Sequence, residues 1–125
     1  MKVVVLGAST NRSKFGNKAV RSYQKFGATV FPVNPSATEI EGVPAYSSLT
    51  ALPETEINRL LVYLPPSVGI TLLAEMQQLN PEEIWFNPGS ESAQLLEQAD
   101  ELGLNVITGC SIVAIGHSPA MFSDE

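Results

Sequence analysis

The sequence predicts an α/β domain in which about five parallel strands form a doubly wound sheet. Short apolar runs alternate with segments in which apolar residues recur at helical spacing. The connections between them are short, and each run is almost entirely apolar, as expected of parallel strands that are buried on both faces. Strands and helices that alternate in this way form one sheet with right-handed crossovers. We expect the spatial order 2-1-3-4-5 and treat residues 1–125 as one domain.

The first strand and helix flank a small polar loop. Residues 3–6 form an unbroken apolar run that Gly7 ends, and residues 15–26 follow at helical spacing, with Gly27 as the expected C-terminal cap. The side expected to be buried holds Phe15, Ala19, Val20, Tyr23 and Phe26. A loop between a strand and a helix start presents free backbone N–H groups and the positive end of the helix. The stretch from Gly7 to Asn17 is therefore a candidate anion site.

The distribution of charge supports an anion site. Residues 1–38 carry +6 and no acid, whereas the rest of the chain carries −12, for a net charge of −6. The six cations are Lys2, Arg12, Lys14, Lys18, Arg21 and Lys25. Cations concentrated around one loop of an acidic protein favour a phosphorylated ligand. For Lys18, Arg21 and Lys25, a solvated helix face is the simpler interpretation.

The remaining elements follow in regular order. A second strand lies within residues 28–33 and ends in Asn34-Pro35. Residues 36–52 form a connector with a turn at 41–44 and at most a short helix at 47–52. Further strands are expected at 59–64, 83–86 and 105–108. Ser67 is the expected N-cap of a second helix that buries Val68, Leu72, Met76 and Leu79. Leu95, Leu96, Ala99 and Leu102 line a third helix, and residues 118–125 are expected to form a loose tail.

The composition excludes several classes of protein. At 125 residues, 44% hydrophobic and 16% charged, the chain suits a compact domain, and it shows neither an apolar run of membrane-spanning length nor a signal-peptide pattern. We therefore expect a cytoplasmic protein with no membrane partner. One cysteine, Cys110, and one histidine, His117, leave too few ligands for a zinc site. The overall acidity argues against nucleic acid as the main partner.

The loops after the first three strands meet at the edge where doubly wound sheets bind ligands. The loop after the first strand would hold phosphate, and the proline-rich ends of the second and third strands would form an apolar slot for an adenine ring. Taken singly, these prolines could simply terminate strands. Ordinary NAD binding has weak support, since the first loop lacks the Gly-x-Gly-x-x-Gly pattern and no acid follows the second strand.

Several motifs together resemble a known family. They are residues 4–9, 14–17, 32–35, 39–49, 65–66 and 85–89, followed by Cys110. In this order and spacing, over nearly the whole length, they are similar to the small stand-alone CoA-binding proteins and to the CoA-binding domain of the succinyl-CoA synthetase α chain. The resemblance implies a Rossmann-like domain that binds coenzyme A. The candidate binding residues are Gly7, Ala8, Ser9, Arg12, Lys14, Phe15, Gly16, Val33, Asn34, Pro35, Leu64, Pro65 and Pro66.

The chain departs from this family in two respects. Relatives usually carry an Asp-Arg pair before the cysteine, where this chain has Thr108-Gly109, so the last loop could meet the ligand differently or not at all. The synthetase's phosphohistidine domain and its partner subunit also have no counterpart in these residues.

The residues favour a binding module for CoA or an acyl-CoA over a self-contained enzyme. His117 has no acid nearby in sequence to orient it, and no basic residue adjoins Cys110 to activate it. An inert buried Cys110 is the simpler interpretation, beside a nucleophile or a mixed disulfide with CoA. One alternative is an NADP-dependent oxidoreductase, with Arg12 and Lys14 on the extra phosphate. Another is a regulatory protein whose acidic half docks on a protein partner.

Overall fold

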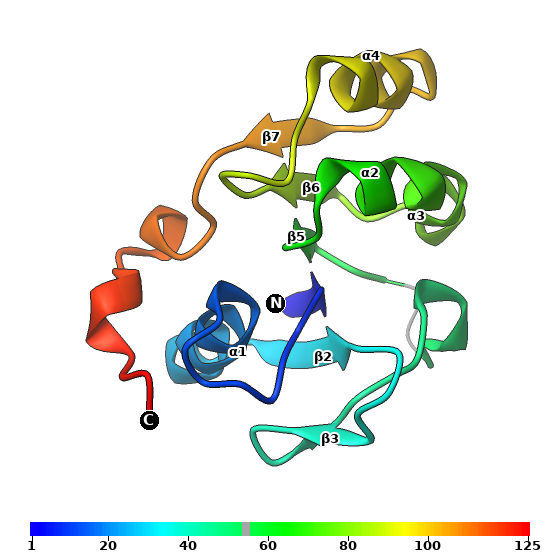
Figure 1. Cartoon of the computed structure of the whole chain (residues 1–125). Coiled ribbons are helices and arrows are strands. Elements are labelled where there is room, and N and C mark those ends of the chain that lie inside the picture. The colour runs from blue at the N-terminus through cyan, green and yellow to red at the C-terminus, as the bar shows by residue number, and fades with distance from the viewer. Residues whose placement is uncertain (54–55) are drawn as a thin grey trace.

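The computed structural model describes residues 1–53 and 56–125. Five parallel strands form the central sheet: β1 (Lys2–Leu6), β2 (Thr29–Val33), β5 (Arg59–Val62), β6 (Glu83–Phe86) and β7 (Val106–Thr108). Their spatial order is β2-β1-β5-β6-β7 (Figure 1). Numbered along the chain, this is the expected order 2-1-3-4-5, so the predicted doubly wound α/β fold is confirmed.

Helices cover both faces of the sheet. Helix α1 (Phe15–Phe26) lies on one face, and α2 (Pro66–Gly69), α3 (Leu73–Leu79) and α4 (Ala93–Glu101) lie on the other (Figure 1). Because successive side chains of a strand point to opposite faces, Val3 and Val5 pack toward α1 while Val4 and Leu6 pack toward α3. No helix in the described part of the chain is long and apolar enough to cross a lipid bilayer.

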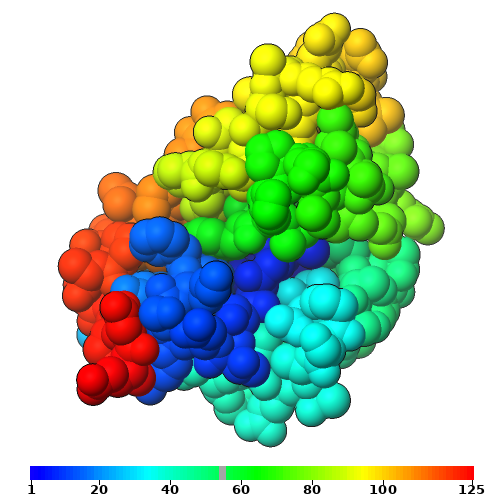
Figure 2. All heavy atoms as spheres, viewed as in Figure 1, coloured from blue at the N-terminus to red at the C-terminus, as the bar shows by residue number. Residues whose placement is uncertain are grey.

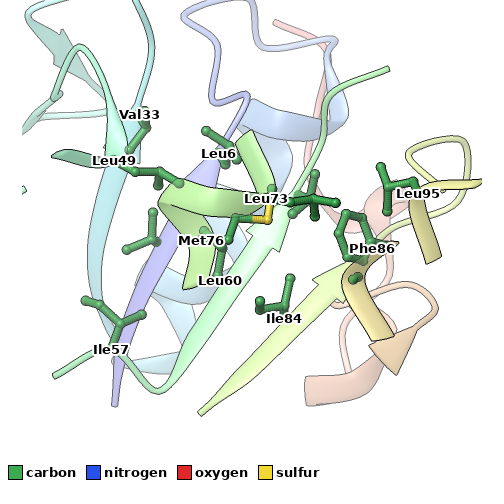
Figure 3. Packing of buried hydrophobic residues seen from close by; sticks show 13 residues of the cluster. Leu6, Val33, Leu49, Ile57, Leu60, Leu73, Met76, Ile84, Phe86 and Leu95 are labelled. Atoms are coloured by element: carbon green, nitrogen blue, oxygen red, sulfur yellow. The ribbon is translucent and has the colours of Figure 1, made fainter. Parts of the chain in front are cut away.

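The larger core lies between the sheet and α3. Leu73 and Met76 of α3 point toward Leu60, Ile84 and Phe86 of the strands (Figure 3), and all five side chains are buried. Burying an aliphatic or aromatic side chain of this size stabilises the fold by about 1.5–3 kcal/mol relative to leaving it exposed. This packing fixes the central strands, whose carboxyl ends carry the loops considered below.

The connector after β2 is more ordered than the sequence predicts. Strands β3 (Glu39–Ile40) and β4 (Val43–Pro44) form a small antiparallel hairpin. Its turn residues Glu41 and Gly42 both have positive φ, at 49° and 80°, as a two-residue hairpin turn of the primed type requires. A single 3-10 turn, η1 (Leu49–Ala51), follows and buries Leu49.

The second helix differs from the prediction. It is divided into α2, a 3-10 turn η2 (Ile70–Leu72) and α3, and it begins at Pro66, so Ser67 is not its N-cap. Proline suits the first helical position because its missing N–H would lack a partner there. The 3-10 turn rotates the face presented to the sheet, so Val68 is exposed and Leu73 takes a buried position instead.

Three apolar residues at helix ends were expected to be buried and are exposed. Phe15 is 60% exposed, Phe26 49% and Leu102 37%. Phe15 is the first residue of α1, and Phe26 is the last. Leu102 lies just after α4. The expected helical stripe therefore holds only for the middle of α1.

The C-terminal segment, which we expected to be a loose tail, lies against α1 (Figure 1). After the short 3-10 turns η3 (Val113–Ile115) and η4 (Pro119–Met121), Phe122 is 9% exposed and its ring faces the Arg21 guanidinium. Arg21 also donates to the Ser123 carbonyl oxygen, and Lys18 pairs with Asp124. These two cations therefore hold the C-terminal segment and are not merely a solvated face.

Candidate functional site

A row of pockets lies along the carboxyl edge of the sheet. The central pocket has a volume of about 470 Å³ and lies between the loops that follow β1, β5 and β6. Its walls are formed by Gly7, Ser9, Lys14, Phe15, Gly16, Tyr63, Leu64, Pro65, Pro88, Gly89 and Ser90. Figure 2 shows the blue loop after β1, the cyan segment after β2 and the green start of α2 gathered around a hollow in this face. The edge is the one that the strand order predicts for a ligand.

Two glycines let the first loop fold tightly over the strand ends. Gly7 has φ of 93°, and a Cβ atom there would lie 2.6 Å from the Tyr63 carbonyl oxygen. A Cβ atom on Gly16 would lie 2.2 Å from the Gly7 carbonyl oxygen. Both distances are far too short for real side chains. The start of α1 therefore rests directly on the end of β1, which brings the helix N-terminus to the pocket.

The N-terminus of α1 is open to an acceptor from outside the helix. Lys14 occupies the N-cap position, its side chain makes no capping hydrogen bond, and the first turn contains no acidic residue. The first N–H groups of a helix have no partner within it, and the helix dipole adds partial positive charge there. Lys14 is exposed and lines the central pocket. Backbone donors, dipole and ammonium group together suit a phosphate.

A second pocket, here called the β2-side pocket, adjoins the central pocket and shares Gly7 and Leu64 with it. It has a volume of about 200 Å³ and a mainly apolar wall. The residues that line it are Leu6, Gly7, Val33, Pro35, Ser47, Ser48, Leu49, Leu64, Val68, Leu72 and Glu75. Its volume and mainly apolar lining suit an aromatic ring beside the phosphate-binding loop.

A third pocket, here called the β7-side pocket, adjoins the central pocket at the other end. It has a volume of about 180 Å³ and shares Phe15, Tyr63 and Pro88 with the central pocket. The complete lining is Phe15, Tyr63, Asn87, Pro88, Cys110, Ile112 and Pro119. The three pockets thus lie side by side from β2 to β7 and share lining residues.

A buried hydrogen-bond network fixes the wall of the β7-side pocket. The side-chain nitrogen of Asn87 donates to the carbonyl oxygens of Val62 (3.2 Å) and Trp85 (3.4 Å). Its side-chain oxygen accepts from the backbone N–H (2.8 Å) and hydroxyl (2.9 Å) of Ser111. The Tyr63 and Ser111 hydroxyl oxygens lie 2.9 Å apart, and burial raises the pKa of Tyr63 above its ordinary value. Tyr63 is therefore neutral at physiological pH.

The structure brings most of the thirteen predicted site residues to these pockets. Seven line the central pocket: Gly7, Ser9, Lys14, Phe15, Gly16, Leu64 and Pro65. Val33 and Pro35 line the β2-side pocket. The other four, which line none of the three pockets, are Ala8, Arg12, Asn34 and Pro66.

The four residues outside the pockets occupy other surroundings. Ala8 is buried, and its carbonyl oxygen accepts a hydrogen bond from the Asn34 side chain at 2.9 Å. Arg12 lies near Glu41, with 3.7 Å between Nη2 and Oε1. Pro66 begins α2. The hydrogen bond between Asn34 and Ala8 ties the loop after β2 to the loop after β1.

Replacing Asn34 by alanine is expected to lower the free energy of unfolding by about 1–2 kcal/mol. Besides its bond to Ala8, Asn34 accepts hydrogen bonds from the backbone N–H groups of Ser36 and Ala37, both at 2.8 Å. Chemical denaturation measures the change. Ser36→Ala is the control, because it removes only a hydroxyl contact at 3.4 Å. Equal stability of Asn34→Ala and the unmodified protein would show that Asn34 does not tie the two loops together.

Sequence reasoning missed the contribution of the fourth strand. Pro88, Gly89 and Ser90, which follow β6, form one wall of the central pocket, and so does Tyr63, which lies just after β5 and not within it. The signal was available, since β6 lies beside β5 and parallel strands end at the same edge.

Cys110 and His117 occupy different surroundings. Cys110 is partly exposed in the β7-side pocket and is not part of a closed core, contrary to the simpler expectation. His117 Nδ1 lies 2.8 Å from the Ser22 hydroxyl, and its ring packs near Phe26 and Phe122, away from the three pockets. Among residues 1–53 and 56–125, no three His, Cys, Asp or Glu side chains gather as a metal site would require.

Comparisons with known proteins bear directly on this site. The family described as CoA binding domain matches residues 1–116. An ADP-forming acetate–CoA ligase of Archaeoglobus fulgidus is 36% identical over 115 residues, which covers 84% of this chain and 17% of the ligase. A subunit α of such a ligase from Pyrococcus furiosus is 31% identical over 64 residues, 50% of this chain and 14% of the subunit. The chain thus spans less than a fifth of these curated relatives.

Solved structures share the fold. A conserved hypothetical protein of Pyrococcus furiosus has a TM-score of 0.83 at 31% identity and aligns with 90% of this chain and 97% of its own. A Thermus thermophilus protein has a TM-score of 0.82 at 30% identity, covering 90% and 85% of the two chains. A Korarchaeum cryptofilum acetyl-coenzyme A synthetase has a TM-score of 0.72 at 21% identity, covering 85% of this chain and 25% of the synthetase.

Proposed function

Because the chain belongs to the CoA-binding domain family, we propose that it binds coenzyme A or an acyl-CoA along the row of pockets. One observation carries the proposal. The central pocket combines an open helix N-terminus and a lysine with apolar pockets on both sides. Coenzyme A needs this combination, because its phosphates lie between an adenosine and a long pantetheine arm.

The phosphates are assigned to the loop after β1. The N–H groups at the start of α1 donate to phosphate oxygens, and Lys14 supplies an ionised donor. Gly7 and Gly16 act by allowing the start of α1 to pack directly on the strand ends, which brings these N–H groups to the pocket.

The adenine ring is assigned to the β2-side pocket and the pantetheine arm to the central pocket. Val33, Leu49 and Leu64 offer apolar walls to the ring. The arm then passes between Pro65 and the loop Pro88–Gly89. This direction places the sulfur end of the ligand toward β7.

The proposal assigns binding, without self-contained catalysis, to this chain. The observation in its favour is the position of His117, whose ring nitrogen is engaged by Ser22 and whose ring packs between α1 and the C-terminal segment. A general base must come within hydrogen-bond reach of the proton that it removes, and the central pocket is lined by other residues.

Calorimetric titration of the reduced protein with CoA, NADP and ATP tests the proposal. We expect saturable binding of CoA at micromolar concentrations and much weaker binding of the other two nucleotides. Preferential binding of NADP would instead favour the oxidoreductase, and hydride transfer from NADPH to an acceptor would then be the next assay. Absence of CoA binding would overturn the proposal.

A further inference from the structure

We propose that the β7-side pocket binds the acyl group of short, uncharged acyl-CoA thioesters. This inference rests on the proposed function, because it takes the acyl group to follow from the pantetheine arm.

The position of the pocket supports this assignment. The β7-side pocket shares Phe15, Tyr63 and Pro88 with the central pocket, whereas the β2-side pocket joins the central pocket at Gly7 and Leu64. A ligand with adenine at the β2 end and phosphates at the start of α1 therefore directs its sulfur toward Cys110 and Ile112. An acyl group on that sulfur enters the β7-side pocket.

The chemistry of the wall favours an apolar group. Ile112 is fully buried, and Phe15, Pro88 and Pro119 add carbon surface. Asn87 is the only amide in the lining of this pocket, and both donors and both acceptor positions of its side chain are engaged within the protein.

The hydroxyl group of Tyr63 in this wall is also engaged. The Tyr63 hydroxyl forms a hydrogen bond with the Ser111 hydroxyl. It stays protonated, because burial raises the pKa of Tyr63. None of the described residues that line the β7-side pocket is Lys, Arg or His. A carboxylate on the acyl chain would therefore lose its water there and find no cation in the wall to pair with.

The size of the pocket sets the length of the acyl chain. Its volume is about 180 Å³. An apolar cavity of about 150 Å³ holds one benzene molecule, so the β7-side pocket suits a chain of roughly four to six carbons. The part of a longer acyl chain that extends beyond the pocket would add little to the affinity.

A series of acyl-CoA titrations tests the inference. Burial of one methylene group is worth about fourfold in affinity, and butyryl-CoA has two more of them than acetyl-CoA, so we expect it to bind about fifteenfold more tightly. Succinyl-CoA is the matched ligand, since it has the same number of acyl carbons but a terminal carboxylate. We expect it to bind at least tenfold more weakly than butyryl-CoA.

A substitution that fills the β7-side pocket tests whether this pocket causes the difference in affinity between butyryl-CoA and acetyl-CoA. Cys110→Leu adds carbon inside the β7-side pocket, so the ratio between the dissociation constants of acetyl-CoA and butyryl-CoA should fall toward one. Val113→Leu is the control, because Val113 is 59% exposed and does not line the pocket, so the ratio should be kept. The ligand series on the unmodified protein remains decisive if Cys110→Leu does not fold.

The outcomes separate the two proposals. Equal affinities for CoA, acetyl-CoA and butyryl-CoA would overturn the acyl pocket and leave CoA binding in place. Tighter binding of succinyl-CoA than of butyryl-CoA would likewise overturn it. No binding of any of these ligands would overturn the proposed function, and the acyl pocket with it.

Discussion

Gly16→Ala is expected to lower the free energy of unfolding by about 2–3 kcal/mol and to abolish most CoA binding. The added methyl group would meet the Gly7 carbonyl oxygen at 2.2 Å and the Gly7 carbonyl carbon at 3.1 Å. Both are backbone atoms, so the conflict is relieved only by moving α1 away from the end of β1. Thermal unfolding should show a midpoint lower by roughly 10 °C, and the helix N-terminus would no longer face the phosphates.

Gly69→Ala is the matched control for Gly16. Gly69 is also a buried helical glycine, but an added Cβ there would meet only a Leu95 methyl carbon at 3.4 Å, an ordinary contact. Because alanine favours the helix over glycine by up to about 1 kcal/mol, we expect Gly69→Ala to be neutral or stabilising. If Gly16→Ala were as stable as Gly69→Ala and bound CoA normally, the close approach of α1 to β1 would not be what builds the site.

Lys14→Ala is expected to weaken CoA binding by about 1.5–3 kcal/mol, roughly a tenfold to hundredfold increase in Kd. Lys14 is exposed at the N-cap of α1, and its side chain makes no capping hydrogen bond, so removing it should leave the fold intact. Calorimetric titration measures the affinity, and circular dichroism confirms the fold. The loss should shrink as ionic strength rises, since salt screens an exposed charge.

Lys25→Ala controls for net charge. Lys25 lies in the last turn of the same helix and does not line the central pocket, so its removal changes the net charge equally without touching the proposed site. We expect CoA affinity to change by less than about twofold. Equal losses for Lys14→Ala and Lys25→Ala would show that only the overall charge of α1 matters.

Local patterns were sufficient to predict the architecture. The apolar run before Gly7, the strands at 83–86 and around 106–108, and the chain order of strands and helices lead directly to the observed sheet. The patterns are local because a strand buried on both faces must be apolar throughout. The loop after β1 was likewise recognisable, as its glycines and cations are consecutive features of the sequence.

Contacts between distant residues limited the prediction of the site. Asn34 follows a strand at the expected edge, yet its side-chain nitrogen donates to the carbonyl oxygen of Ala8, 26 residues away in sequence, and sequence alone does not reveal this contact. Tyr63 continues the apolar pattern of β5 but lies beyond the last paired residue.

The same limit applies at the C-terminus. Phe122 packs against α1, although about a hundred residues separate it from Arg21 in the sequence. Nothing within residues 118–125 themselves indicates this contact. Such contacts depend on tertiary packing, which overrides the local pattern.

The most direct test of where CoA binds is a map of backbone amide NMR shifts during a CoA titration. We expect the largest changes at Gly7, Lys14, Phe15, Gly16 and Gly89, all in the wall of the central pocket. Changes at these residues, with His117 and Asn105 unaffected, would support CoA binding across the carboxyl edge of the sheet. Changes confined to Thr50, Gln78 and Asn80, which line a separate pocket between η1 and α3, would contradict it.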